Sequence, residues 1–313
     1  MTNGHIDLHI HSIYSDGTDT PREVLEIAER KGLQVVSITD HDTVSGINEF
    51  LDAASDFKVI ALPGIEFSVN DYNGLKDIDL LGYFPDIQKF KDSFEAIDNL
   101  CTRIKNARLD RLKKIVAILN KNGIKIGCEQ IFEAHSDQNK TFGRKHIADM
   151  AYQNNPQKFS CVQDVFDQYL GNGCCADVPI DMQLTLKTAS AFIHSWGGVS
   201  VLAHPGISNG RIPDAQRGHA LIDAAVEFGD VDGIEGYYLY HKNRPYVGHY
   251  KISKEENQKL CTEYIAHIKR LGKIYTAGSD SHGKNKNIEI GENCGGFPLY
   301  EKLLGAFKER FSS

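Results

Sequence analysis

Apolar and polar positions alternate along the first third of the chain in a pattern that is typical of βαβ units. The apolar runs that we expect to form strands are 6–10, 35–39, 59–67 and 78–84. Thr20, Pro21 and Glu23 form a capping box with proline at the first helical position, which predicts that a helix begins there. The sequence therefore predicts strands that alternate with helices.

The pattern changes after residue 87. Residues 87–121 predict one or two long helices, and 124–182 are irregular and helical in pieces. The alternation then resumes, so that about seven strands interleaved with helices are expected. This order is typical of an α/β barrel with its site residues at the C-terminal strand ends. We expect a discontinuous barrel domain at 1–87 and 183–313, interrupted by a mainly helical insertion or cap at 88–182.

Charge is distributed unevenly along the chain. It has 35 Lys and Arg against 42 Asp and Glu, a net charge of −7 with histidine neutral. Residues 88–160 carry 14 basic and 8 acidic side chains, a net of +6, which leaves −13 for the remainder. The acidic body disfavours long nucleic acid as a partner. Acidic clusters can instead hold metal ions, and a basic segment beside them can attract an anionic substrate.

The composition is that of a globular protein, with 41% hydrophobic and 25% charged residues. No apolar run approaches the ~18 residues of a membrane span, and the first residues lack the basic and apolar regions of a signal peptide. The seven cysteines form no CxxC pair, which is typical of free thiols. We therefore expect a cytoplasmic protein that does not bind membranes, and no obligate protein partner is evident.

Residue types that bind metal ions gather at the predicted strand ends. His9 and His11 are two apart on one strand and so point to the same face, and Asp280 and His282 have the same spacing after the last strand. The full set of candidate ligands is His9, His11, Asp16, His41, Glu66, Asp79, His204, Asp280 and His282. A single one of them is more often a polar residue satisfied by hydrogen bonds. Together they would bury several carboxylates side by side, which is costly without a cation, so the set favours a metal cluster.

These residues resemble those of a known family. The motifs D-L-H-I-H-S, S-D-G, T-D-H-D, P-G-I-E, A-H-P-G and G-S-D-S-H-G occur in the order expected of the PHP (polymerase and histidinol phosphatase) superfamily. The chain is most similar to its stand-alone metal-dependent phosphoesterase branch, and the resemblance extends into the insertion at 143–148 and 166–171. It implies a distorted seven-stranded (β/α)7 barrel and two or three divalent metal ions.

The resemblance also implies how the ligands are shared. The first ion would be held by His9, His11, Glu66 and Asp280. Glu66 would bridge to a second ion, which His204 and residue 79 also hold, and the third would be held by Asp16, His41 and His282. Imidazoles and carboxylates suit Mn, Fe or Zn. His41 or His204 are candidate catalytic groups, because either could donate a proton to the leaving group, although both are expected first as ligands.

Residue 79 departs from the branch, which more often has histidine there. In one interpretation the carboxylate of Asp79 replaces the imidazole as a ligand. In the other, Asp79 is no ligand and the second ion is weakly bound or absent. We favour ligation, because an unpaired carboxylate beside Glu66 would be repelled and partly desolvated.

The basic insertion contains candidates for binding phosphate. Arg144 offers a planar bidentate fork to phosphate, and the resemblance implies the same role for Arg144 and His146. Lys242 and Arg244 lie in an aromatic-rich segment after a predicted strand and could reach a second phosphate, although a surface loop with packed tyrosines is an equal interpretation.

The predicted function is that of a metal-dependent phosphoesterase. Its substrate would be a small phosphorylated molecule such as a nucleotide or a phosphoribosyl compound, attacked at phosphorus by an activated hydroxide. The resemblance allows a 3′-phosphate monoesterase, a cyclic phosphodiesterase or a 5′→3′ exonuclease on short RNA. A non-catalytic PHP scaffold module and a metal amidohydrolase are the rivals. The nearly complete ligand set disfavours the scaffold, and Arg144 in its basic insertion disfavours the amidohydrolase.

Overall fold

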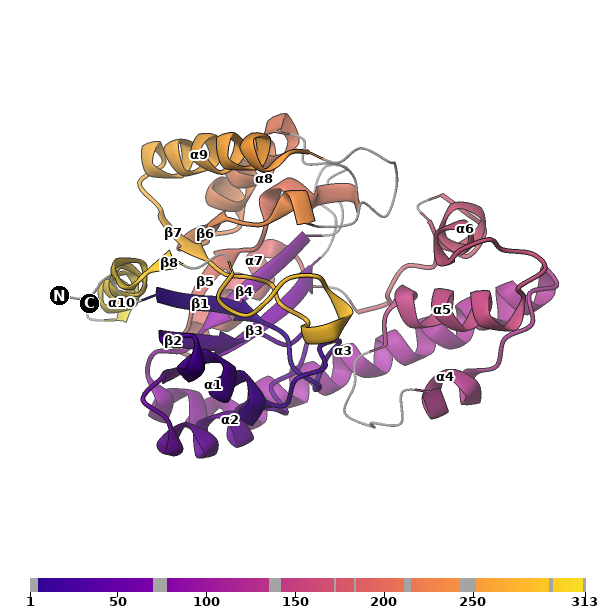
Figure 1. The fold of residues 1–313 in the computed structure, drawn as a ribbon, viewed down its shortest axis with the longest axis horizontal. Coiled ribbons are helices and arrows are strands. Elements are labelled where there is room, and N and C mark those ends of the chain that lie inside the picture. The colour runs from indigo at the N-terminus through magenta and orange to yellow at the C-terminus, as the bar shows by residue number, and fades with distance from the viewer. Residues whose placement is uncertain are drawn as a thin grey trace. The chain divides into compact units, whose positions relative to one another are not determined.

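The structure of the chain is a computed structural model (Figure 1). It describes residues 5–69, 78–134, 142–171, 173–182, 184–210, 215–242, 252–292 and 295–311. The chain forms two compact units. One comprises Met1–Asn99 with Leu184–Ser313, and the other comprises Leu100–Gln183. The division falls within helix α3 (Ile87–Lys121), later than the insertion boundary expected from the sequence.

An eight-stranded sheet lies in the first unit. Its strands are β1 (His5–Ile10), β2 (Leu33–Ile38), β3 (Ile60–Val69), β4 (Ile78–Tyr83), β5 (Val199–Leu202), β6 (Gly233–Tyr237), β7 (Ile274–Ala277) and β8 (Gly295–Gly296). Their order is β7-β6-β5-β4-β3-β2-β1-β8. Strands β1 to β3 are parallel to one another, as are β5 to β7, whereas β4 is antiparallel to both of its neighbours.

The first and seventh strands meet through the segment that follows β7. The N–H of Asp280 donates to the carbonyl of His9 at 2.8 Å, and the N–H of His11 donates to the carbonyl of Ser281 at 2.9 Å. These bonds join β1 to β7 as a seven-stranded barrel, which confirms the predicted fold class. The sequence did not predict β8, which is antiparallel to the start of β1, because two glycines carry no strand pattern.

Helices pack against the strands of the first unit. They are α1 (Pro21–Arg30), α2 (Ile47–Ala53), α7 (Leu186–Ser195), α8 (Ala215–Phe228), α9 (Lys254–Arg270) and α10 (Phe297–Phe311). In Figure 1, α1 and α2 lie beside β2 and β3, and α9 lies beside β6 and β7. The predicted capping box is present at α1, where the hydroxyl of Thr20 accepts the N–H of Glu23. Leu8, Leu81, Val201 and Leu303 belong to one buried core, which joins three strands to α10.

The second unit is helical and has its own core. Residues 87–121 form one helix of 35 residues, α3, rather than two. The shorter helices are α4 (Cys128–Ala134), α5 (Arg144–Asn154) and α6 (Val162–Val165), and a π-helical turn follows at Phe166–Leu170. Leu119, Ile131, Ile147 and Leu170 are buried in its core. Among the helices of the described residues, none has the length and apolar character that crossing a membrane requires.

Candidate metal centre

All nine predicted ligands lie in the described part of the chain and meet at one end of the barrel. They come from β1 and the turn after it (His9, His11, Asp16), from the loop after β2 (His41), from β3 (Glu66), from β4 (Asp79), from the loop after β5 (His204) and from the turn after β7 (Asp280, His282). Their ligand atoms fall into four overlapping groups, and the atoms of each group lie within 4.8 Å of one another. The structure therefore brings the whole predicted set together.

The direction of β4 explains how Asp79 joins this end. Asp79 is the second residue of β4, and the strand is antiparallel to β3 and β5, so its start lies at the C-terminal end of its neighbours. Asp79 pairs with Ser68, and Glu66 pairs with Leu81. Paired residues, and residues two apart on a strand, share a face of the sheet. Glu66 and Asp79 therefore point to the same side.

His9, His11 and Asp280 form one buried group, and the buried carboxylate of Glu66 lies against it. Nε2 of His11 lies 3.1 Å from Oε2 of Glu66 and 3.2 Å from Oδ1 of Asp280. Nε2 of His9 lies 3.4 Å and 3.5 Å from the same two atoms. The Nε2 atoms of His9 and His11 are 3.2 Å apart. Two imidazoles and two carboxylates thus present ligand atoms to one small volume.

Glu66 faces a second group with its other oxygen. Oε1 lies 3.2 Å from Nε2 of His204, and the same imidazole nitrogen is 3.9 Å from Oδ2 of Asp79. On the first side, Oε2 also lies 3.2 Å from Nδ1 of His41. The carboxylate is therefore placed between four imidazoles, as a bridging ligand would be.

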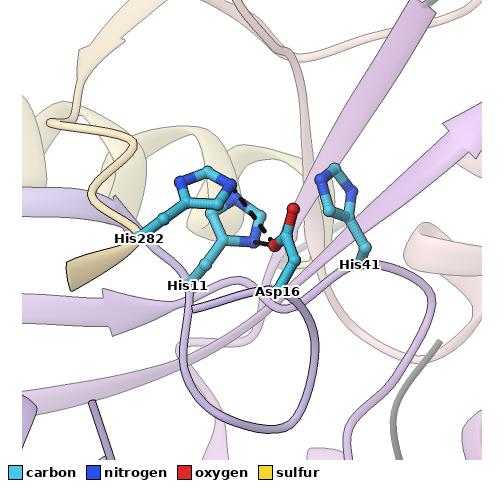
Figure 2. Close-up of side chains that lie close together, drawn as sticks. All are labelled: His11, Asp16, His41 and His282. Atoms are coloured by element: carbon cyan, nitrogen blue, oxygen red, sulfur yellow. Dashed lines mark ion pairs between the residues drawn. The ribbon is translucent and has the colours of Figure 1, made fainter. Parts of the chain in front are cut away.

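Asp16 forms the centre of the third group, which Figure 2 shows with His11, His41 and His282. Its Oδ1 atom lies 3.3 Å from Nε2 of His282 and 3.5 Å from Nδ1 of His11. The rings of His11 and His282 stack at a centroid distance of 4.2 Å. His11 thus borders two groups, which the resemblance did not imply.

Glu66 also tests whether these residues fit metal ions. Its Oε2 atom is buried and accepts no hydrogen bond from the described residues, although imidazole nitrogens of His9, His11 and His41 surround it. Leaving a buried charged acceptor without a hydrogen bond costs more than about 1–3 kcal/mol. A divalent cation between the carboxylate and the nitrogen lone pairs removes that cost. The residues present therefore fit a metal cluster.

The electrostatics of the cluster are consistent with this fit. Burial lowers the pKa of His11, but the neighbouring Asp280 and Glu66 carboxylates outweigh it and raise the pKa to about 10. Burial works against ionisation of Glu66, yet His41 and His9 hold its pKa well below the usual range. In the absence of a cation, protonated imidazoles thus balance the negative charge of the carboxylates. Cation binding to such a cluster releases protons.

Asp79 has a different electrostatic environment. Burial and the nearby Glu66 carboxylate raise its pKa to about 6, although His204 and His41 act in the opposite direction. The cluster therefore leaves Asp79 as its least compensated carboxylate. That is the property expected of a group that gains most from a cation.

Glu235 is a buried carboxylate that the sequence analysis did not single out. It lies in β6 without exposed surface, and its Oε1 atom accepts the hydrogen bond of Nδ1 of His9 at 3.2 Å. Its Oε2 atom accepts the N–H of His204 at 3.0 Å. It holds the His9 ring with Nε2 toward the cluster, as carboxylates behind metal-binding histidines do. The sequence does contain a signal for Glu235, because this charged residue interrupts the short run Gly233–Tyr237, which otherwise suits a buried strand.

Two more residues near the cluster were missed. Oδ1 of Asp40 accepts the N–H of Ser12 at 2.8 Å and the hydroxyl of Ser15 at 2.5 Å, which fixes the turn that carries Asp16. Asp40 precedes His41 in a motif that the sequence analysis quoted, but its role depends on a turn 25 residues away. Lys286 forms an ion pair with Asp280. It lies in a polar loop, where no sequence signal separates it from other lysines.

The two phosphate-binding candidates of the insertion lie in the first turn of α5, in the second unit. Nη1 of Arg144 donates to the carbonyl of Leu170 at 3.4 Å. Nδ1 of His146 accepts the N–H of Gly143 at 3.0 Å, so this imidazole caps the helix. Phosphate binding by Arg144 and His146 stays a prediction.

The other two phosphate-binding candidates follow β6. Lys242 forms an ion pair with Glu292, so its charge is already partnered. Arg244 lies outside the described residues. Tyr238, in the same aromatic segment, is buried with its ring 5.2 Å from that of His204. This tyrosine packs against the cluster and does not offer an open face for a base.

The chain is similar in sequence to known proteins over most of its length. The family model of the PHP domain matches residues 7–183. The chain is 27% identical over 285 residues to the phosphoribosyl 1,2-cyclic phosphate 1,2-diphosphodiesterase of Eggerthella lenta, which covers 89% of this chain and 94% of that protein. It is 31% identical over 278 residues to the 3′,5′-nucleoside bisphosphate phosphatase of Chromobacterium violaceum, with 89% and 87% covered.

A solved structure extends the similarity to the fold of the whole chain. It is that of a Bifidobacterium adolescentis protein, provisionally described as a metal-dependent phosphoesterase. The two chains are 26% identical, with a TM-score of 0.70 and coverage of 98% of this chain and 97% of the other.

Proposed function

The chain belongs to the PHP family and is a hydrolase of phosphoric ester bonds, and we propose that it acts on a small phosphorylated substrate. The substrate we propose is a nucleotide or a phosphoribosyl phosphate ester, cyclic phosphates included. One observation carries the proposal: the Glu66 carboxylate lies between four imidazoles at the barrel end and lacks a hydrogen bond on Oε2. The names of the two relatives above support a substrate of this class.

Two or three divalent ions would be held by the cluster. We propose His9, His11, Glu66 and Asp280 for the first, Glu66, Asp79 and His204 for the second, and Asp16, His41 and His282 for the third. When bound, Mn, Fe or Zn ions supply an activated water for attack on phosphorus and neutralise charge on the phosphate oxygens. The protein then contributes the positions of these ligands, which Glu235 and Asp40 fix from behind.

The remaining roles fall to side chains near the cluster and in the insertion. Of the two candidate proton donors, His41 has the more exposed side chain, 27% against 9% for His204. For a centre with two ions, where His41 is not a ligand, we assign to it the proton transfer to the leaving oxygen, and to His204 a ligand role only. Arg144 and His146 are the proposed phosphate contacts, because a guanidinium gives two parallel charge-assisted hydrogen bonds to a phosphate.

A substrate panel tests this function. Purified protein with added Mn would be given nucleoside 3′,5′-bisphosphates, ribosyl cyclic phosphates, short RNA and N-acyl amino acids. We expect hydrolysis of a bisphosphate or a cyclic phosphate, its loss with a chelator, and recovery when Mn, Fe or Zn is restored. Hydrolysis of the N-acyl compounds alone, or full turnover by metal-free protein, would contradict the proposal. If short RNA were the only substrate cleaved, the proposed substrate class would be wrong, while the proposed metal centre would stand.

A further inference from the structure

The two carboxylate oxygens of Asp280 have different neighbours. Oδ1 faces the imidazoles of His9 and His11 within the cluster. Oδ2 points to another pair of groups: it accepts the hydroxyl of Tyr238 at 2.5 Å and forms an ion pair with Nζ of Lys286. The ammonium of Lys286 therefore contacts the carboxylate that we propose as a ligand of the first metal ion.

Lys286 contacts two side chains of the barrel, Asp280 and Tyr238. It follows the short turn Gly283–Asn285, in the segment after β7 that is yellow in Figure 1. Besides Asp280, its ammonium donates to the hydroxyl oxygen of Tyr238 at 3.1 Å and lies 5.4 Å from the centre of that ring. An ammonium group has three N–H donors. Within the described residues two of them have partners, which leaves one for a further acceptor.

The exposed fractions of these side chains indicate from which side a further acceptor can reach Lys286. Tyr238 is 1% exposed, whereas the Lys286 side chain is 18% exposed and that of Asp280 is 7% exposed. The side chain of Lys286 is thus accessible to solvent, whereas Tyr238, which it contacts, is buried. An acceptor that comes from solvent can therefore reach the lysine side chain.

Charge favours an anion as the acceptor. Among the described residues, Asp280 is the carboxylate with which Lys286 forms an ion pair. A cation at Oδ1 would share the charge of this carboxylate and weaken its attraction for the ammonium. A phosphate close to the cluster offers non-bridging oxygens to the remaining N–H, and such charge-assisted hydrogen bonds are stronger than neutral ones. The contact would come from the barrel, independently of the insertion that carries Arg144.

We propose that Lys286 is a substrate-binding residue, whose ammonium donates to a non-bridging oxygen of the reacting phosphate while it keeps its contact with Asp280. This inference rests on the proposed function, since the phosphate is that of the proposed substrate. The competing role is that of a positioning residue, which would only hold Asp280 in its orientation. The two roles differ in what the lysine's loss does to metal binding and to phosphate binding.

The experiment compares Lys286→Met and Lys286→Arg with Lys284→Met, a matched control on an exposed lysine of the same loop. Each protein is saturated with Mn, and its metal content, its affinity for inorganic phosphate by calorimetry, and its kcat/KM on a cleaved substrate are measured. We expect Lys286→Met to raise the Kd of phosphate and lower kcat/KM by roughly 10- to 100-fold, the range for a charge-assisted hydrogen bond. Its metal content should stay at the wild-type value, Lys286→Arg should keep most of the affinity, and Lys284→Met should match wild type.

An unchanged phosphate Kd in Lys286→Met would overturn the inference. A fall in Mn content with unchanged phosphate affinity at saturating Mn would also overturn it and would assign Lys286 to positioning Asp280. The phosphate titration needs no turnover. If the wild type cleaved no phosphate ester, the proposed function would fail while the titration still decided whether Lys286 binds phosphate.

Discussion

Glu235 and His9 form a buried pair in which Oε1 of the carboxylate lies 3.2 Å from Nδ1 of the imidazole and neither side chain is exposed. The carboxylate makes Nδ1 the protonated nitrogen and leaves the lone pair on Nε2, which faces the cluster. Glu235→Gln keeps the shape and removes the charge. We expect the affinity for Mn to fall by about 10- to 100-fold, as measured by titration of metal-free protein. Glu227→Gln, on the exposed face of α8, is the control, and equal affinities in the two variants would contradict this role.

His11 borders two of the ligand groups, so its removal affects both. His11→Ala is expected to lower kcat by several orders of magnitude, because charge neutralisation and the nucleophile each contribute several kcal/mol. His5→Ala, on an exposed histidine at the start of the same strand, should retain wild-type turnover. Steady-state kinetics at saturating Mn compare the two. Wild-type turnover in His11→Ala would move the reaction elsewhere.

Asp79 offers a test of how many ions the cluster binds. If its carboxylate is a ligand of the second ion, Asp79→Ala should lose about one metal ion per chain and keep the ion held by His9, His11 and Asp280. The raised pKa of Asp79, about 6, comes from burial and from the adjacent Glu66, so this carboxylate gains from a cation. Elemental analysis of variant and wild type provides the measurement. The same metal count in both proteins would show that Asp79 is not a ligand.

Arg144 is predicted to bind phosphate without touching the metal ions. Arg144→Ala should lower kcat/KM by about 10- to 150-fold, the equivalent of a lost charge-assisted bidentate contact of roughly 1.5–3 kcal/mol. Metal content should stay unchanged. Lys145→Ala is the control, since that neighbouring lysine is exposed and pairs with Asp149. An unchanged kcat/KM in Arg144→Ala would show that Arg144 does not bind the reacting phosphate.

Away from the cluster, Asp232 predicts how stability depends on pH. Its burial favours the protonated form, but hydrogen bonds from His194 and from the N–H of Ser200, together with Arg310, lower the pKa below the usual range. A carboxyl group whose pKa is lower in the folded state stabilises the fold above its unfolded pKa of about 3.9. That contribution is lost as the pH falls through the folded pKa.

Asp232→Asn should therefore lower Tm by several degrees at pH 7, and its difference from wild type should shrink below about pH 4. Thermal unfolding of both proteins from pH 7 to pH 3 measures this difference. Asp52→Asn, at an exposed position of α2, is the control and should follow wild type throughout. A difference that stays constant over this range would mean that the ionised carboxylate contributes nothing.

The barrel and the gathering of the candidate ligands at its end could be predicted because both have local signals. His9 and His11 share a face through the two-residue period of a strand. His204 follows the apolar run of β5, which ends at the same edge as its parallel neighbour β6. The direction of β4 could not be predicted. A run of apolar positions predicts a strand but not its direction relative to its neighbours, and only the pairing with β3 and β5 orients β4.

The residues behind the ligands were harder to predict, for a physical reason. Glu235 acts through His9, which lies 226 residues away in the sequence, so tertiary contacts alone create this pair. Lys286 lies only 6 residues after Asp280, but the path of the loop between them decides whether the two side chains meet. Strand periodicity places a side chain on a face, but it does not say which loop will pass beside it.

The hydrogen bonds that join β1 to the segment after β7 link residues about 270 positions apart, as the bond from Ser279 to the carbonyl of His9 shows. During synthesis, the ribosome releases the N-terminal histidines long before it has made Asp280. The proposed first metal site therefore lacks Asp280 on a nascent chain until residues 279–282 have emerged and docked. Because contacts of such long range form slowly, we expect the four proposed ligands of this site to come together only when the barrel closes.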